Sequence, residues 1–130
     1  MTDAQVIHTD EGTANVKYML LIYAEPQDRE PTPEEWAASM PAWEAFGNEL
    51  RARNAWVDAA PLAGVASATT VRIRDGKRVV TDGPFAETKE WLGGYYIIDA
   101  PSLDGALEAA AMCPGAKDGS VEVRPIVDLG

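Results

Sequence analysis

Acidic and basic side chains capable of acid–base chemistry crowd into one short stretch of this chain. The segment Asp82–Glu90 reads DGPFAETKE. A carboxylate such as that of Asp82 or Glu87 acts as a general base when burial raises its pKa towards neutrality. The ammonium group of Lys89 could neutralise an anionic substrate or stabilise an enolate-like intermediate. Asp82, Glu87 and Lys89 are therefore the candidate catalytic residues.

A second set of residues could hold a small, partly aromatic ligand beside these groups. A tyrosine offers a hydroxyl for hydrogen bonding and a ring for contact, and a phenylalanine offers the ring alone. Carboxylate and guanidinium groups add one charge of each sign. The candidate ligand-binding residues are Tyr23, Phe85, Glu90, Tyr95 and Arg124. Tyr96, next to Tyr95, offers the same chemistry.

The same segment also has the composition of a turn. Asp bonds its own backbone, Gly permits a positive φ and Pro fixes φ, while Phe could plug the core. The charges that follow could pair with each other or with an arginine. Turn chemistry accounts for residues 82–85 but not for Glu87, Lys89 and Glu90. Structural, ligand-binding and catalytic roles all stay open for the segment.

The sequence predicts neither a metal site nor a cofactor. It holds one histidine, His8, and one cysteine, Cys113, which leaves carboxylates whose spacing fits no calcium loop. The paired glycines Gly93 and Gly94 lie inside an expected strand. A phosphate-binding loop would instead join a strand to a helix.

Composition and charge indicate which kinds of partner and which cellular compartment to expect. A chain of 130 residues suits one domain with a sizeable core. Its formal net charge of -10, from 21 acidic and 11 basic residues, repels a phosphate backbone, although Arg72, Arg74, Lys77 and Arg78 form a small basic cluster. No apolar run approaches the roughly 20 residues that span a membrane, the N-terminus lacks a signal-peptide pattern, and a single cysteine suits a reducing compartment. We expect a cytoplasmic protein that binds neither nucleic acid nor membrane.

Apolar periodicity predicts a strand and a long helix in the first half of the chain. Lys17–Ala24 is continuously apolar after its first residue, as in a strand covered on both faces. Thr32–Glu35 combines an N-cap, a first-turn proline and a capping box, so a helix should begin there. Pro41 should kink this helix or divide it in two. One buried stripe is expected from Trp36, Met40, Trp43, Phe46 and Leu50. The same stripe could instead line a ligand pocket.

Strand signals dominate the middle of the chain. Trp56–Leu62 reads as a short strand that loses its ladder near Pro61. Asp75-Gly76, between two alternating runs, is a strong hairpin signal. Trp91–Ile98 is a second strand of the buried type. Its Gly93-Gly94 pair suggests a bulge, or close approach of a ligand or another chain.

A second helix and a last strand complete the order of elements. Ser102 caps the helix and Cys113–Gly115 stops it. Pro125 places the last strand at a sheet edge, or marks that strand's end. Without the hairpin the order is β-α-β-β-α-β, a ferredoxin-like α+β fold with two helices on one face of an antiparallel sheet. Residues 1–15 should be a flexible polar extension, and residues 16–130 a single domain.

The other face of such a sheet is predicted to be covered by a second copy of the chain. Lys17–Ala24 and Trp91–Ile98 are apolar on both faces, and a bare face of this kind would be too large an exposed patch for a stable monomer. We therefore expect a homodimer that associates through its sheet faces. The extension of residues 1–15 could reach across that dimer and regulate access to a site.

Four segments together resemble the YCII-related, or DGPF-domain, family. They are Lys17–Tyr23, Asp82–Glu90, Leu92–Tyr96 and Gly119–Pro125. The resemblance covers residues 17 to about 128, and the nine-residue DGPFAETKE motif is its most specific part. It implies a dimeric α+β barrel built from ferredoxin-like subunits with an inserted hairpin.

The resemblance implies less about activity. Other dimeric α+β barrels are isomerases, dehalogenases or monooxygenases, which is only an analogy of fold. A His and Asp pair has been proposed as the catalytic site of the wider family, but this chain has no histidine after His8. We therefore expect a small-molecule-binding protein whose chemistry, if any, uses the carboxylates and the lysine of the motif without a cofactor. Because members are often encoded beside extracytoplasmic-function sigma factors, the alternative is a regulatory or protein-interaction module.

Overall fold

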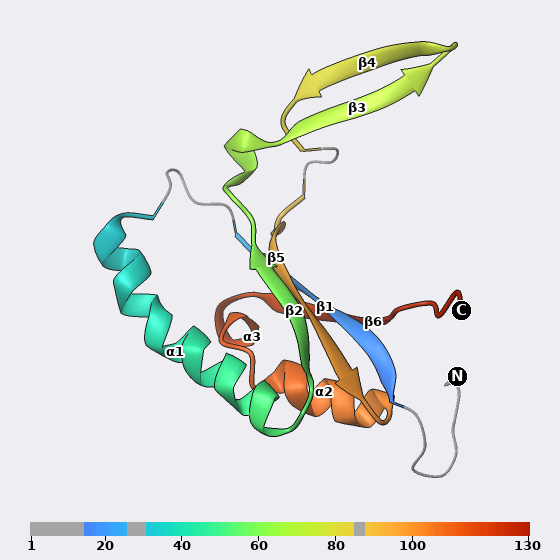
Figure 1. Cartoon of the computed structure of the whole chain (residues 1–130). Helices are drawn as coiled ribbons and strands as arrows, with labels where there is room; N and C mark the ends of the chain where they lie inside the picture. Colours follow the sequence, from blue (N-terminus) through green and yellow to red (C-terminus); the bar gives the residue numbers. More distant parts are fainter. Residues whose placement is uncertain (1–14, 26–30, 85–87) are drawn as a thin grey trace.

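The computed structural model describes residues 15–25, 31–84 and 88–130 (Figure 1). The expectations for the extension and its His8, and those for Phe85 and Glu87, therefore lie outside the described residues.

A four-stranded antiparallel sheet in the order β2-β5-β1-β6 forms the centre of the domain, and a separate two-stranded hairpin joins β3 to β4. Helices cover one face of the sheet (Figure 1). This is the predicted ferredoxin-like α+β arrangement with an inserted hairpin. The elements are β1 (Val16–Ala24), α1 (Pro33–Ala52), β2 (Trp56–Pro61), the 3-10 turn η1 (Val65–Ser67), β3 (Thr69–Arg74), β4 (Lys77–Asp82), β5 (Trp91–Ala100), α2 (Leu103–Ala111), α3 (Gly115–Asp118) and β6 (Ser120–Pro125).

Helix α1 begins as its sequence predicts. The Thr32 hydroxyl accepts a hydrogen bond from the Glu35 backbone N–H at 3.1 Å, and the Glu35 carboxylate accepts one from the Thr32 N–H at 2.9 Å. This reciprocal pair satisfies two backbone donors at the helix start. At the other end Asn54 adopts a φ of 56°, the left-handed conformation that stops a helix.

The predicted buried stripe of α1 is only half correct. Phe46 and Leu50 are 3% and 0% exposed, whereas Trp36 and Met40 are each 44% exposed. The carboxyl-terminal half of α1 lies against the sheet and the amino-terminal half diverges from it (Figure 1). Helical spacing defines a stripe, but it does not fix how far the sheet extends beneath it. Nor does Pro41 divide the helix, which is continuous from Pro33 to Ala52.

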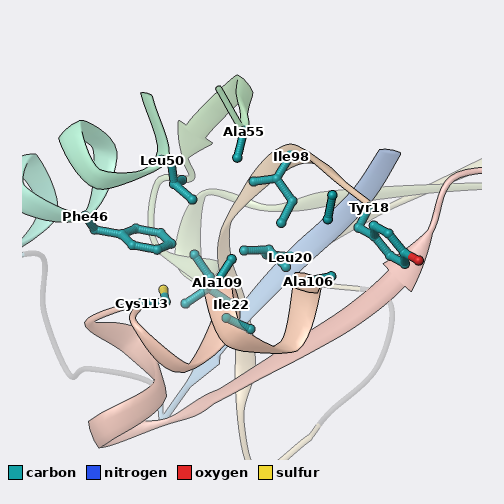
Figure 2. Close-up of a cluster of buried hydrophobic side chains, with 12 residues drawn as sticks. Tyr18, Leu20, Ile22, Phe46, Leu50, Ala55, Ile98, Ala106, Ala109 and Cys113 are labelled. Carbon is teal, nitrogen blue, oxygen red and sulfur yellow. The ribbon is translucent and has the colours of Figure 1, made fainter. Parts of the chain in front are cut away.

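The core lies between the sheet and its helices. Leu20 of β1, Leu50 of α1 and Ile98 of β5 are completely buried, and Figure 2 shows them converging with residues of α2. Fully burying a side chain of this size stabilises a fold by about 1.5–3 kcal/mol. The rest of the buried cluster is Tyr18, Ile22, Phe46, Ala55, Ala100, Ala106, Ala109, Ala110 and Cys113.

The predicted irregularity at Gly93 and Gly94 is a β-bulge combined with a close approach of backbone. Ile22 pairs with Gly94 and Tyr23 pairs with Leu92, so Gly93 is the extra residue of β5. A Cβ on Gly94 would lie 3.0 Å from the carbonyl oxygen of Ala60 in β2. Gly94 therefore allows the edge strand to pack tightly. That strand ends at Pro61, and β6 is an edge strand that ends at Pro125, as predicted.

The hairpin β3–β4, which we call the arm, projects away from the rest of the domain (Figure 1). Asp75 and Gly76 form its turn with φ values of 53° and 74°. Two successive left-handed residues match the twist of a tight hairpin, so this prediction is confirmed. At the base of the arm the Gly83 N–H donates to the Ala68 carbonyl at 2.7 Å.

In the part of the chain that the structure describes, no helix lies on the second face of the four-stranded sheet, which we call the open face (Figure 1). Strand alternation places Met19 and Leu21 of β1 opposite Ile97 and Tyr95 of β5 on this face. Among the described residues, no helix combines the length and apolarity needed to cross a membrane.

Candidate functional site

The beginning of the DGPFAETKE motif closes the base of the arm. Asp82 is the last residue of β4 and pairs with Thr69. Gly83 has a φ of 101°, and its carbonyl accepts a hydrogen bond from the Thr70 hydroxyl at 2.8 Å. The positive φ predicted for the glycine of the motif is therefore present at Gly83.

The candidate catalytic side chains of the motif face solvent where they are described. Asp82 and Lys89 are both exposed, and Glu90 is half-buried. The Thr88 hydroxyl donates a hydrogen bond to the Glu90 carbonyl, which orders the approach to β5. The contacts of these residues show a turn and a strand entry, and their catalytic role stays a prediction.

Three of the candidate ligand-binding residues share the open face of the sheet. Leu21 pairs with Tyr95 and Met19 pairs with Arg124, so both partners lie on the same side as Tyr23. The guanidinium of Arg124 lies 3.5 Å from the carboxylate of Glu122. Tyr96, one residue after Tyr95, points to the opposite face, where α1 packs.

A groove of about 470 Å³ lies between α1 and the sheet, on the face that carries the helices. Helix residues spaced three or four apart form one wall, because such positions share a helix face. Strands β2 and β5 supply the other wall. The lining residues are Met40, Trp43, Glu44, Gly47, Asn48, Arg51, Trp56, Ala59 and Tyr96.

Two aromatic residues that line this α1 groove, Trp43 and Tyr96, pack against each other. The ring of Tyr96 stacks on Trp43, with centroids 6.2 Å apart and planes inclined by 13°. It also meets Phe46 edge to face at 4.9 Å. Offset and edge-to-face pairs are the favourable aromatic geometries, so these contacts hold the ring of Tyr96, which lines the groove.

Arg51 places a positive charge in the groove. Its guanidinium carbon lies 4.7 Å from the centre of the Trp56 ring, a cation–π contact. A Cβ on Gly47 would lie 3.3 Å from an Arg51 guanidinium nitrogen, so glycine leaves room for this side chain. Within the described part of the chain, no carboxylate forms an ion pair with Arg51, whereas its neighbour Arg53 pairs with Glu49 at 2.8 Å and with Glu108 at 3.8 Å.

Burial raises the pKa of two weak acids, Tyr96 in the groove lining and Cys113 near it. Burial raises the pKa of Tyr96, the nearby Cys113 raises it further, and Arg51 acts in the opposite direction. Burial likewise raises the pKa of the Cys113 thiol, against the backbone N–H groups of Gly115 and Ala116. At neutral pH, Tyr96 therefore offers a neutral hydroxyl that can donate a hydrogen bond.

The sequence predicts only part of the groove. It offers Tyr96 beside Tyr95, and the Trp and Met stripe of α1 as a pocket wall, but it does not single out Asn48, Arg51 or Trp56. The available signal is the spacing of Met40, Gly47 and Arg51, which places all three on one helix face. Gly47 is itself a signal, because a glycine destabilises a helix interior. Among the described residues, no group of three or more His, Cys, Asp or Glu side chains is placed to hold a metal ion.

The model of the YCII-related domain matches residues 16–130. The chain belongs to the YCII-related family. It is also similar to Uncharacterized protein R00369 of Rhizobium meliloti (strain 1021), with 49% identity over 69 residues. The aligned part is 52% of this chain and 56% of the relative, so the chain spans a little over half of that relative's length.

Proposed function

We propose that this YCII-related protein binds a small aromatic anion in the α1 groove. The carrying observation is the guanidinium of Arg51, held over the Trp56 ring at a groove edge without a carboxylate partner among the described residues. The planar guanidinium of an arginine can bind a carboxylate or another planar anion through two parallel hydrogen bonds. Trp43 and Tyr96 supply flat apolar surfaces for the ring of the ligand.

The groove is polar at separated points along its length. Glu44 and Arg51 are seven residues apart on α1, which corresponds to about 10 Å of helix rise, and Asn48 lies between them. A ligand with an anionic group at one end and a hydroxyl at the other therefore matches the lining. Its hydroxyl would donate to the Glu44 carboxylate while its anion accepts from Arg51.

Calorimetric titration with 6-hydroxy-2-naphthoate tests this proposal. Replacing Arg51 with Gln should weaken binding by about 10- to 100-fold, because a hydrogen bond to a charged group contributes about 1.5–3 kcal/mol. The matched control is Arg53→Gln, the same change two residues along the helix, where the side chain pairs with Glu49 instead. The neutral amide of the same ring system should bind more weakly to the wild-type protein.

The variant Asp82→Asn distinguishes binding in the α1 groove from binding at the motif. Asp82 is exposed at the base of the arm, so its substitution should leave the titration unchanged. Absence of binding by the wild-type protein, or equal losses with Arg51→Gln and Arg53→Gln, would remove the basis of the proposal. A loss confined to Asp82→Asn would instead place the ligand at the motif.

The open face supports the homodimer that the sequence predicts. The two central strands carry Met19, Leu21, Tyr95 and Ile97, and none of the helices within residues 15–25, 31–84 and 88–130 covers them. A second copy that packs its own open face against this one would remove that apolar surface from water. The charged positions at the borders, such as Lys17 with Asp99 at 3.4 Å, would lie at the rim of the interface.

A further inference from the structure

The arm exposes an apolar surface that the domain itself does not cover. Directly opposite residues of a hairpin share a face, and Val71 lies opposite Val80. Val71, Ile73 and Val80 are 57%, 60% and 53% exposed. They form one continuous face along both strands, which we call the apolar face of the arm.

A hairpin of this kind needs a partner to be stable. An isolated two-stranded sheet is marginally stable at best in water. The arm leaves the domain at the end of the sheet where β2 ends and β5 begins, and it projects beyond the rest of the fold (Figure 1). A favourable turn at Asp75 and Gly76 nonetheless stabilises this hairpin.

Charge indicates which partner the arm fits. Four of the chain's 11 basic residues lie within residues 69–82, against two of its 21 acidic residues. The arm is therefore basic, and the remainder of the same chain is strongly acidic. Arg78 lies opposite Ile73 and so stands on the apolar face itself. A surface that combines valine and isoleucine with a positive charge complements an acidic protein surface with apolar patches.

We propose that the apolar face of the arm packs against a second copy of this chain, so that in a homodimer the arm of each subunit contacts the body of the other. The body of a second copy supplies the acidic charge that the arm lacks. This contact is separate from the open face of the sheet and adds to it. It also gives the inserted hairpin a function that does not depend on ligand binding in the groove.

The test is the dimer dissociation constant, measured by sedimentation over a range of protein concentrations. The double variant Val71→Thr and Ile73→Thr keeps both residues β-branched, so it preserves the strand while removing apolar surface. In a symmetric dimer each substitution acts twice, so the dissociation constant should rise at least about 100-fold. The matched control is Val79→Thr on the opposite face of the arm, which should change the constant by no more than about threefold.

A second variant keeps the test valid if the substitutions disturb the hairpin. The Gly83 N–H bonds the Ala68 carbonyl at 2.7 Å, so a two-glycine linker can replace residues 69–82 without moving the ends. This excision should also weaken the dimer at least about 100-fold, while the helical circular dichroism signal of the domain is kept. Arg78→Glu should weaken the dimer and reduce its salt dependence.

Three results would overturn the proposal. The wild-type protein could sediment as a monomer at every concentration. It could form a dimer whose dissociation constant responds no more to the double variant and the excision than to Val79→Thr. A labelled DNA duplex could bind in an arm-dependent manner while dimerisation is unaffected by the arm, which would assign the arm to an acidic polymer instead.

Discussion

The two faces of the four-stranded sheet are built from neighbouring residues of the same kinds, yet they have different roles. Leu20 and Tyr96 face the helices, where one is completely buried in the core and the other lines the α1 groove. Leu21 and Tyr95, one position away, pair with each other on the open face. Strand register, rather than residue type, therefore decides which leucine holds the core and which tyrosine meets the groove.

The largest expected loss of stability comes from a substitution on the core face of the sheet. Leu20→Ala removes a completely buried side chain and should lower the free energy of unfolding by about 3 kcal/mol. Leu21→Ala, on the open face, should cost about 1 kcal/mol or less at protein concentrations low enough to favour monomers. Urea denaturation of both variants measures the difference. Equal losses would show that the open face is as tightly packed as the core.

The bulge provides a second pair of neighbours. Gly94→Ala should destabilise the fold by about 2 kcal/mol, because the new Cβ would press on the backbone of Ala60 and Pro61. Gly93→Ala meets only ordinary contact, 3.8 Å from the Ile22 carbonyl oxygen, and should change stability by less than about 1 kcal/mol. The same urea denaturation experiment measures the difference between the two variants. A larger loss at Gly93 would mean that the bulge is placed incorrectly.

Alkaline pH should destabilise the fold through Tyr96 and Cys113. Burial raises the pKa of Tyr96 above its ordinary value of 10.0 and that of Cys113 above 9.0. A raised pKa means that the folded state holds the proton more tightly than the unfolded state does. The stability that this difference contributes is fully present below the pKa values of the unfolded state. It is lost as the pH rises through the pKa values of the folded state.

The measurement is the melting temperature between about pH 8 and about pH 10.5. The melting temperature of the wild-type protein should fall across this range, and Tyr96→Phe should reduce the slope. An identical slope in the wild-type protein and in Tyr96→Phe would show that Tyr96 does not couple its ionisation to folding.

Much of the fold could be predicted because local signals agree with the final arrangement. The capping box at Thr32, the turn at Asp75 and the bulge at Gly93 each depend on a few adjacent residues, and each is confirmed. The exposure of Trp36 and Met40 could not be predicted in this way. It depends on the angle between α1 and the sheet, which is a property of the tertiary packing.

The groove was harder to predict than the fold because its residues come from three elements. Arg51, Trp56 and Tyr96 lie on α1, β2 and β5, and no motif in the sequence joins them. The DGPFAETKE segment was conspicuous because its unusual residues are contiguous. Its first residues have a clear structural role at the base of the arm, where Gly83 bonds Ala68 and Thr70.

We propose that the ligand lies in the α1 groove rather than at the motif, and the four tryptophans report directly on the position of the ligand. Trp43 and Trp56 line the groove, Trp36 does not, and Trp91 directly follows the motif. The measurement is the NMR spectrum of the four indole N–H groups of nitrogen-15-labelled protein during titration with 6-hydroxy-2-naphthoate. We predict that the Trp43 and Trp56 signals shift and saturate together while those of Trp36 and Trp91 stay in place. A saturating shift of Trp91 alone, with Trp43 and Trp56 unmoved, would contradict the account.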